Sequence, residues 1–336
     1  MKKTLRVLIV SSYSVAFVLR DIELLQQHFN VEVANFVGIK KTIRETLKTI
    51  IVIWKKLQSC DLSFIWFADF RAMITIMFSK LLKKKTILVV GGYEVANEPQ
   101  ISYGGAFSPK LKSKISWIIR HADVVLSVSE ASKNELIQNY GYTQSILVYN
   151  GVETEKFLVD SVIPKENIAI TVGAVTSSNL SRKGIETFVK AAAYLPGIPF
   201  YVIGKADEAT LQYLKKIATE NVIFTGYVIE EELIRFYQKA RVYVQVSGHE
   251  GFGISLAEGM LCECIPVVTK KGALPELVGD NGYYVPFNAP EETAKAIQKA
   301  LQSTKGTHVR NHILEHFSMQ RRENALVNLI KHTAWK

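Results

Sequence analysis

Short runs of apolar, often β-branched residues alternate along this chain with longer segments in which apolar residues recur at helical spacing. The strands predicted in the first half are residues 5–12, 30–36, 62–67, 86–90 and 123–128. The helices predicted between them are residues 20–29, 43–57, 72–82 and 110–121. Strands and helices that alternate in this way indicate a parallel sheet with helices on its faces.

A turn signal at Asn150-Gly151, followed by Pro164, interrupts this alternation. Five more strands are then predicted, at residues 167–173, 198–204, 221–226, 242–246 and 265–269. The chain of 336 residues is long enough for two domains. The predicted fold class is therefore α/β, with two doubly wound, Rossmann-like domains at 1–150 and 151–317. A C-terminal helix at about 318–336 is expected to pack back onto the first domain.

Ligands of doubly wound sheets bind outside the carboxyl ends of the strands. With two such domains, the expected site is a cleft across which the domains face each other. Loops that follow the predicted strands are therefore the segments in which to look for chemistry.

The most informative of these loops follows the strand at 242–246. It reads SGHEGFGISLAEGM, with Glu250 and Glu258 eight positions apart and a helix predicted at 254–262. Gly251 and Gly253 let a ligand approach the backbone, and the unpaired N–H groups of the first helical turn favour an anion. Because helical side chains lean toward the N-terminus, the carboxylate of Glu258 is expected over that same turn.

A nucleotide sugar would satisfy both halves of this pattern, since its diphosphate suits the amides and its hydroxyl groups suit the two carboxylates. The spacing alone also allows a simpler interpretation. In that interpretation Glu250 is a helix-start acid, Glu258 is a solvated helix position, and the glycines only form a turn.

Arg182 and Lys183 come after the strand at 167–173, where a helix from Ile185 to Leu195 is predicted to open. Two cations at a helix start fit a diphosphate clamp, although a solvated surface pair is the alternative. No Asp-x-Asp triplet occurs in the chain, so a metal-bridged diphosphate site of that type is not expected. Fixed cations and helix amides would then neutralise the charge of the diphosphate.

These segments together resemble the retaining glycosyltransferases of family 4, which are GT-B-fold enzymes that use nucleotide sugars. The resemblance covers about residues 145–290 and rests on segments 150–157, 182–184, 248–259, 273–278 and 281–286. It implies transfer of a hexose-type sugar, with retention of anomeric configuration, to a glycan or lipid-linked acceptor bound by the first domain. The nucleotide-diphosphate sugar is the donor substrate, bound by the second domain, and the resemblance implies no cofactor.

The resemblance also implies roles for single residues. Glu250 is expected to face the transferred sugar and Glu258 to hold the ribose. Lys183, with Arg182, is expected to clamp the diphosphate. The other implied donor contacts are Gly251, Phe252, Gly253, Ile254, Ser255, Gly204, Gly226, Tyr227 and Val228.

Three positions depart from the family's pattern. Ala174 stands where the family often has an arginine, which makes Arg182 the hypothesised replacement cation. Residues 11–14 (Ser-Ser-Tyr-Ser) stand where a Gly-Gly loop is common. Many members carry a histidine after the fourth strand, but here the loop is Gly-Gly-Tyr-Glu at 91–94. Glu94 is thus the candidate polar residue near the reacting centre, and a purely structural carboxylate is the alternative.

The net charge of +10 is unevenly distributed. Residues 1–150 contain 20 basic and 11 acidic residues, whereas residues 151–336 contain 21 and 20. The basic helices at 43–57, 72–85 and 110–120 have apolar faces, which are either core faces or contacts to an anionic membrane surface. No apolar run is long enough to span a bilayer. We therefore expect a cytoplasmic protein, peripheral at the inner face of the cell membrane, that does not bind nucleic acid.

Other readings of the sequence are weaker. Leu5–Ser12 is followed by no glycine before Gly38, which excludes a Gly-x-Gly-x-x-Gly dinucleotide site after the first strand. Cys262 and Cys264 have no second pair for a metal site, and the three histidines at 308, 312 and 316 have no evident partner ligand. A sugar-nucleotide epimerase, or a non-enzymatic protein that binds membrane or nucleic acid through the basic half, remains the alternative function.

Overall fold

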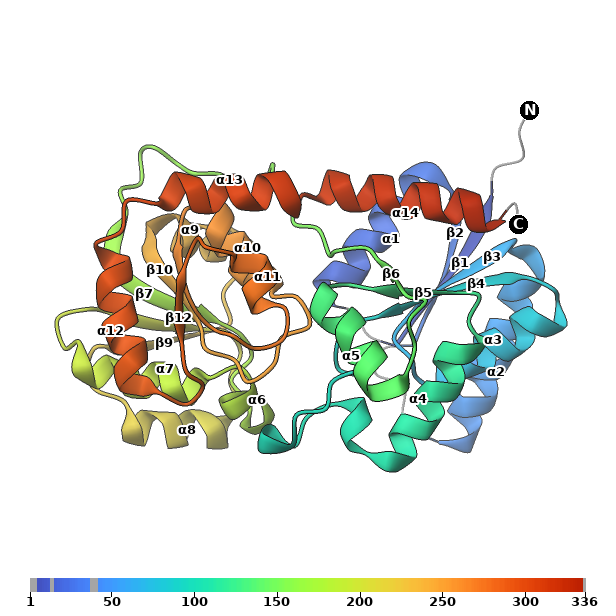
Figure 1. The fold of residues 1–336 in the computed structure, drawn as a ribbon, viewed down its shortest axis with the longest axis horizontal. Helices are drawn as coiled ribbons and strands as arrows, with labels where there is room; N and C mark the ends of the chain where they lie inside the picture. Colours follow the sequence, from blue (N-terminus) through green and yellow to red (C-terminus); the bar gives the residue numbers. More distant parts are fainter. Residues whose placement is uncertain (1–4, 13–14, 37–41, 335–336) are drawn as a thin grey trace. The chain divides into compact units, whose positions relative to one another are not determined.

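The computed structural model describes residues 5–12, 15–36 and 42–334. The chain divides into two compact units, of which one comprises residues 1–150 with 320–336 and the other residues 151–319. Each unit contains one six-stranded sheet (Figure 1). The predicted Ser-Ser-Tyr-Ser loop falls partly outside the described residues, because Tyr13 and Ser14 are not among them.

The sheet of the first unit has the strand order β2-β1-β3-β4-β5-β6, with all pairs parallel. Its strands are β1 (Arg6–Ser11), β2 (Asn30–Asn35), β3 (Leu62–Trp66), β4 (Lys85–Val90), β5 (Val124–Ser127) and β6 (Ile146–Leu147). Its helices are α1 (Ala16–His28), α2 (Ile43–Ser59), α3 (Phe70–Leu81), α4 (Pro109–His121) and α5 (Glu130–Tyr140), with short 3-10 turns η1 (Pro99–Ile101) and η2 (Gly105–Phe107).

Local sequence signals explain where these helices begin and end. The side chain of Thr42 accepts a hydrogen bond from the backbone N–H of Glu45 and so caps α2. Asp69 caps α3 in the same way through two backbone N–H groups. Helix α5 begins in a capping box at Ser129 and ends at Gly141, whose left-handed φ of 62° suits glycine.

The second unit repeats the architecture with the strand order β12-β11-β10-β7-β8-β9, again all parallel. Its strands are β7 (Glu166–Val172), β8 (Phe200–Ile203), β9 (Val222–Gly226), β10 (Ala240–Gln245), β11 (Ile265–Thr269) and β12 (Tyr283–Val285). Its helices are α6 (Ser177–Arg182), α7 (Ile185–Ala191), η3 (Ala192–Tyr194), α8 (Glu208–Ile217), α9 (Glu230–Lys239), α10 (Ile254–Leu261), α11 (Leu274–Val278), α12 (Pro290–Leu301) and α13 (Gly306–His316).

The predicted α/β fold class is confirmed, and α7 begins at Ile185 as expected. The short helix α6 in front of it was not predicted. Arg182 ends α6, Lys183 follows it, and α7 begins after the left-handed Gly184. Four of the six residues of α6 are serine or asparagine, which favour loops and caps, so the apolar pattern carried no signal for this helix.

The last helix, α14 (Met319–Ala334), belongs to the first unit from Gln320 onward. Its Arg322 is buried and donates two hydrogen bonds to the buried Asp21 of α1, at 2.6 and 2.7 Å. Arg322 also donates to the carbonyls of Val148 and Tyr149, and its guanidinium lies 5.5 Å from the ring centre of Trp66. One buried cation thus joins three separate segments of this unit.

No helix of the described residues combines the length and the apolar character that crossing a membrane requires.

Candidate active site

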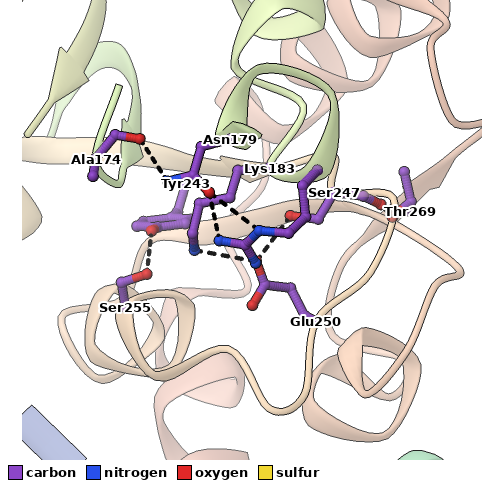
Figure 2. A network of polar contacts seen from close by, with 9 residues as sticks. Ala174, Asn179, Lys183, Tyr243, Ser247, Glu250, Ser255 and Thr269 are labelled. Atoms are coloured by element: carbon purple, nitrogen blue, oxygen red, sulfur yellow. Dashed lines mark hydrogen bonds and ion pairs between the residues drawn. The ribbon is translucent and has the colours of Figure 1, made fainter. Parts of the chain in front are cut away.

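The site is built around Glu250, in the loop between β10 and α10. Strand β10 is buried almost throughout, and the loop that follows it is held from two sides. The N–H of Gly248 donates to the carbonyl of Arg182. The hydroxyl of Thr269 donates to the carbonyl of Ser247 (Figure 2). The loop is therefore fixed to the end of α6 and to β11.

The carboxylate of Glu250 is the centre of a polar cluster and is only 7% exposed. Lys183 donates from Nζ to its Oε1 at 3.1 Å, and the hydroxyl of Ser247 donates to the same oxygen at 3.1 Å (Figure 2). The guanidinium of Arg182 lies 3.8 Å from that oxygen as an ion pair. Two neighbouring cations from a distant segment of the chain, 67 positions away in the case of Lys183, thus meet the first of the two glutamates.

The charge of Glu250 is stabilised despite its burial. Burial alone would raise the pKa of this carboxyl, but the positive charges of Lys183 and Arg182 outweigh that effect, and the pKa lies below its ordinary value. Glu250 is therefore ionised at neutral pH, and the cluster as a whole carries a positive charge.

Arg182 is anchored by a residue that the sequence analysis did not single out. Asn179 of α6 accepts two hydrogen bonds from the Arg182 guanidinium, at 3.1 and 2.8 Å. The amide of Asn179 in turn donates to the carbonyl of Ala174 at 2.8 Å (Figure 2). Arg182 is thereby tied to the loop in which the resemblance expected an arginine and the chain has Ala174.

Two glycines allow the backbone segments of this site to approach each other. Gly184 has a φ of +68°, and a Cβ at this position would lie 2.1 Å from the carbonyl oxygen of Val246. A Cβ on Gly272, at φ +53°, would lie 2.2 Å from the carbonyl oxygen of Glu250. Any side chain at either position would therefore displace the loop that carries Glu250.

The glycine-rich stretch after Glu250 leads directly into α10. Phe252 is buried, and Gly253 has a φ of +106° and starts the helix without a side-chain cap. The first-turn residues Ile254 and Ser255 follow, and the hydroxyl of Ser255 accepts a hydrogen bond from Tyr243 at 2.9 Å. The first turn of α10 thus presents backbone N–H groups that no side-chain cap satisfies.

Glu258 lies one turn further along α10 and is 6% exposed. Its Oε2 accepts a hydrogen bond from the hydroxyl of Tyr237, on α9, at 3.2 Å. The interpretation of Glu258 as a solvated helix position is wrong, because the side chain is buried within the second unit.

The other sequence-predicted donor contacts follow the neighbouring strands β8 and β9. Gly204 and Gly226 have φ values of +146° and +71°. The N–H of Gly204 donates to the carbonyl of Gly226, so the two strand ends lie side by side. Tyr227 is 75% exposed, and Val228 follows it in the loop before α9.

A pocket with a volume of about 400 Å³ lies at the ends of β11 and β12 in the same unit. Lys271 lines this pocket, and two residues further on the N–H of Ala273 donates to the carbonyl of Glu250. The pocket therefore adjoins the loop that carries Glu250. The residues lining it are Thr269, Lys270, Lys271, Tyr284, Val285, Pro286 and Phe287.

Glu94, the candidate in the first unit, is 4% exposed. Its carboxylate accepts hydrogen bonds from the backbone N–H groups of Ala68 and Gly91, at 3.2 Å each, and so connects the loops that follow β3 and β4. Burial raises its pKa to about 7, against the lowering effect of these backbone donors. Glu94 is thus a buried carboxyl that titrates near neutral pH.

The sequence also offered two weak candidates for a metal site, one at Cys262 and Cys264 and one at the histidines of α13. Among the described residues, no group of three or more histidine, cysteine, aspartate or glutamate side chains is arranged to hold a metal ion. Cys262 and Cys264 are buried, and burial raises the pKa of both thiols. His312 packs against His316 and lies 3.1 Å from the carbonyl oxygen of Leu277.

Four contributing residues were missed at the sequence level: Asn179, Ser247, Tyr237 and Gln245. Gln245 is buried at the end of β10, near enough to Glu250 to help lower its pKa, although neither of its amide atoms meets hydrogen-bond geometry with a described residue. Ser247 stands three positions before Glu250, and this spacing was the one signal available. The others reach the site from separate strands and helices, so no local pattern identified them.

Two family models match this chain. The one described as Glycosyltransferase Family 4 matches residues 8–156, and the one described as Glycosyl transferases group 1 matches residues 153–313. The second match contains the whole Glu250 cluster.

Among curated proteins, an uncharacterized glycosyltransferase of Methanocaldococcus jannaschii is 27% identical over 283 residues, which are 74% of this chain and 69% of that protein. The O-antigen chain mannosyltransferase B of Escherichia coli is 27% identical over 198 residues, or 54% of this chain and 52% of the relative. The alignment with the latter thus spans about half the length of the relative.

Among solved structures, Anabaena HepE in complex with UDP and glucose superposes with a TM-score of 0.81 at 16% sequence identity, covering 97% of this chain and 99% of the other. At this identity the likeness shows the fold, which is that of the GT-B structures.

Proposed function

Because this chain is a glycosyltransferase with the GT-B fold, we propose that it transfers a hexose from a nucleoside diphosphate sugar to a hydroxyl group of a glycan or lipid-linked acceptor, with retention of anomeric configuration. The observation that carries this proposal is the cluster in which Lys183, Arg182 and Ser247 surround the buried carboxylate of Glu250. The second unit would bind the donor and the first unit the acceptor.

The chemical problem of this reaction is charge. The diphosphate gains negative charge as it leaves, while the anomeric carbon becomes cation-like. Lys183 uses one of its three donors on Glu250, which leaves two for phosphate oxygens, and Arg182 adds a second fixed cation. Preorganised cations of this kind stabilise charge that develops in the transition state. The leaving phosphate would itself accept the proton of the acceptor hydroxyl.

The other parts of the nucleotide sugar would meet matching residues in the second unit. The amides of Gly251 to Ser255 would meet phosphate and sugar oxygens at the start of α10. Glu250 would accept hydrogen bonds from hydroxyls of the transferred sugar, once the phosphate draws on Lys183. Glu258 would bind the ribose diol, with Tyr237 orienting its carboxylate. The segment Gly226–Val228 would lie against the base.

The relatives suggest where to begin with the sugar and the acceptor. The E. coli relative is named as a mannosyltransferase of an O-antigen chain, and the HepE structure contains UDP and glucose. We therefore propose mannose and glucose as the first hexoses to test, and a bacterial surface glycan or its lipid-linked precursor as the acceptor class.

The test of this function is a thermal-shift screen against UDP, GDP and ADP and their mannose and glucose conjugates. We expect one nucleotide class to raise the temperature midpoint of unfolding. The matching sugar nucleotide should then support transfer to a lipid-linked or glycan acceptor, and NMR of the product should show the same anomeric configuration as in the donor. Rapid conversion of the donor alone to an isomeric sugar would identify an epimerase instead. No shift with any nucleotide would contradict the proposal.

Glu94 is proposed as the acceptor-side carboxyl, and its titration gives a prediction for stability. Its folded pKa of about 7 lies above the ordinary value of 4.5, so the folded state holds a proton that the unfolded state has lost between these pH values. The contribution of Glu94 to the free energy of unfolding should therefore be full below about pH 4.5 and fall as the pH rises toward 7, by about 3 kcal/mol at most.

The measurement is urea unfolding of the wild type and of Glu94→Gln at about pH 5 and about pH 8. We expect the variant to lose less stability than the wild type over this interval, whereas Glu23→Gln, at an exposed position of α1, should follow the wild type. Parallel pH profiles for wild type and Glu94→Gln would show that Glu94 does not titrate in this range.

We also propose that the protein works as a peripheral protein at an anionic membrane, in keeping with a lipid-linked acceptor. The basic excess of the first 150 residues supports this, since a surface rich in Lys and Arg is attracted to anionic lipid.

A further inference from the structure

Helix α2 exposes an apolar stripe that faces no part of the described chain. Ile43, Leu47 and Ile51 follow one another at four-residue spacing and therefore share one face. Their exposed fractions are 83, 55 and 51%. The face that packs on the sheet is a different one, formed by Thr49, Ile53 and Leu57. The stripe is thus not needed for the core.

Helix α3 carries a second exposed apolar stripe next to the first. Phe70, Met77 and Leu81 lie at seven- and four-residue spacing, and each is more than two-fifths exposed. The two helices pack side by side, with Trp54 of α2 edge-on to Phe78 of α3 at 5.0 Å between ring centres (Figure 1). Trp54 lies eleven positions after Ile43 and so continues the first stripe as far as this contact with α3.

Cations border this apolar surface. Glu45 is the one acid in the two helices, and it is paired with Lys48 at 2.8 Å. Between residues 43 and 85 the chain has nine basic and three acidic residues. The exposed cations on or just beyond the two helices are Arg44, Lys48, Lys55, Lys80 and Lys83.

Not every lysine in this region is available to a partner. The ammonium of Lys84 donates to the carbonyls of Leu57, Gln58 and Cys60 and so caps the end of α2. Lys56 is paired with Glu32 of β2. The cations that remain exposed lie along the apolar stripe of α2 and at the end of α3, where they would reach the same partner as the apolar side chains.

We infer that the surface formed by the exposed faces of α2 and α3, the α2–α3 surface, docks on an anionic lipid bilayer. This inference names the contact face for the membrane attachment proposed above and rests on it. Apolar side chains beside a row of cations match the boundary between acyl chains and anionic headgroups. A second copy of the chain fits less well, because two such surfaces would bring their cations against each other.

The test is co-sedimentation of the full chain with vesicles of phosphatidylcholine alone or mixed with phosphatidylglycerol. Wild type should bind the mixed vesicles about tenfold more tightly, and this preference should weaken as salt is added. The double variant Leu47→Gln/Ile51→Gln should lose about tenfold or more of this binding. Both positions are half exposed, so the fold should be kept, which circular dichroism checks. The matched control is Val162→Gln/Ile229→Gln, at exposed apolar positions of the second unit, and should bind as wild type does.

A charge variant separates the two components of the surface. Arg44→Gln/Lys55→Gln should remove most of the preference for phosphatidylglycerol and leave the weak binding to phosphatidylcholine unchanged. Equal binding of this variant and wild type to the mixed vesicles would contradict the role of the cations.

The outcomes distinguish this inference from the proposals on which it rests. If wild type binds neither vesicle, membrane attachment and the α2–α3 surface both fail, while the nucleotide screen still decides the transferase function. If wild type and Leu47→Gln/Ile51→Gln bind mixed vesicles equally, attachment stands and this surface is the wrong one. If the double variant instead changes a dimer to a monomer with lipid binding unaltered, the surface is a self-association face and the inference is overturned.

Discussion

Replacing Lys183 with methionine is expected to lower kcat for sugar transfer about 10²- to 10³-fold, the cost of removing one preorganised charge-stabilising donor. The ammonium of Lys183 lies 3.1 Å from the buried Glu250, while 20% of the Lys183 side chain is exposed. In the proposed reaction this cation neutralises the leaving diphosphate. Methionine has a similar length without the charge, so the loss would report the charge and not the packing.

The measurement is steady-state transfer with the donor that the nucleotide screen identifies, reported as kcat and KM separately. Lys190→Met is the matched control, because Lys190 is an exposed lysine in the next helix, paired with Glu186 at 2.5 Å, and its loss should change kcat less than threefold or so. Activity of Lys183→Met within a few-fold of wild type, in a protein that unfolds at a similar temperature, would contradict the assigned role. Adding Glu250→Gln should cost less than the two separate losses combined, since the residues act as one unit.

Replacing Asp21 with asparagine is expected to destabilise the first unit by about 3–5 kcal/mol. Asp21 and Arg322 are both buried and joined by two hydrogen bonds. The substitution would leave the guanidinium of Arg322 buried next to a neutral amide, and a buried charge without its partner is costly. Because Arg322 also holds the carbonyls of Val148 and Tyr149, the last strand of the unit should loosen as well.

Urea unfolding followed by circular dichroism and by tryptophan fluorescence would measure this loss, since the indole of Trp66 donates to Asp21 at 3.1 Å. The control Glu323→Gln lies in α14, as Arg322 does, and removes the more exposed ion pair with His28. It should lower the free energy of unfolding by less than about 1 kcal/mol. The double variant Asp21→Leu/Arg322→Met removes both charges and should recover part of the stability. A loss below about 1 kcal/mol in Asp21→Asn would show that α14 does not depend on this pair.

Several elements that the sequence predicted well are strands with uniform burial. Strands β1, β3, β4 and β11 are buried along nearly their whole length, and such apolar runs between helices can be found without knowing the fold. Helix α6 and strand β12 were missed, because the first is polar and the second has three residues. Short elements of this kind are stabilised by their neighbours and not by their own pattern.

Within the candidate site, the sequence identified Glu250, Glu258, Lys183 and the glycines because these residue types are grouped in short segments. It placed Arg182 and Lys183 just before the helix at Ile185, and the structure has them there, at the end of the unpredicted helix α6. The expectation that the two cations clamp one diphosphate came from their adjacency and from the resemblance. The contact between Lys183 and Glu250 joins residues that are 67 positions apart, and no local sequence pattern predicts a contact over that distance.

The sequence by itself determined the α/β fold of two parallel sheets and the segments that carry the candidate chemistry, because strand burial, helix spacing and glycine-rich turns are local properties of the chain. The tertiary structure alone decided that Lys183, Arg182 and Ser247 converge on one carboxylate, that Asn179 holds Arg182, and that Arg322 joins α14 to Asp21. These contacts form between residues distant in the chain, since folding brings the ends of separate parallel strands to one edge of a sheet. There, buried carboxyl groups are stabilised by a partner of opposite charge or by hydrogen-bond donors.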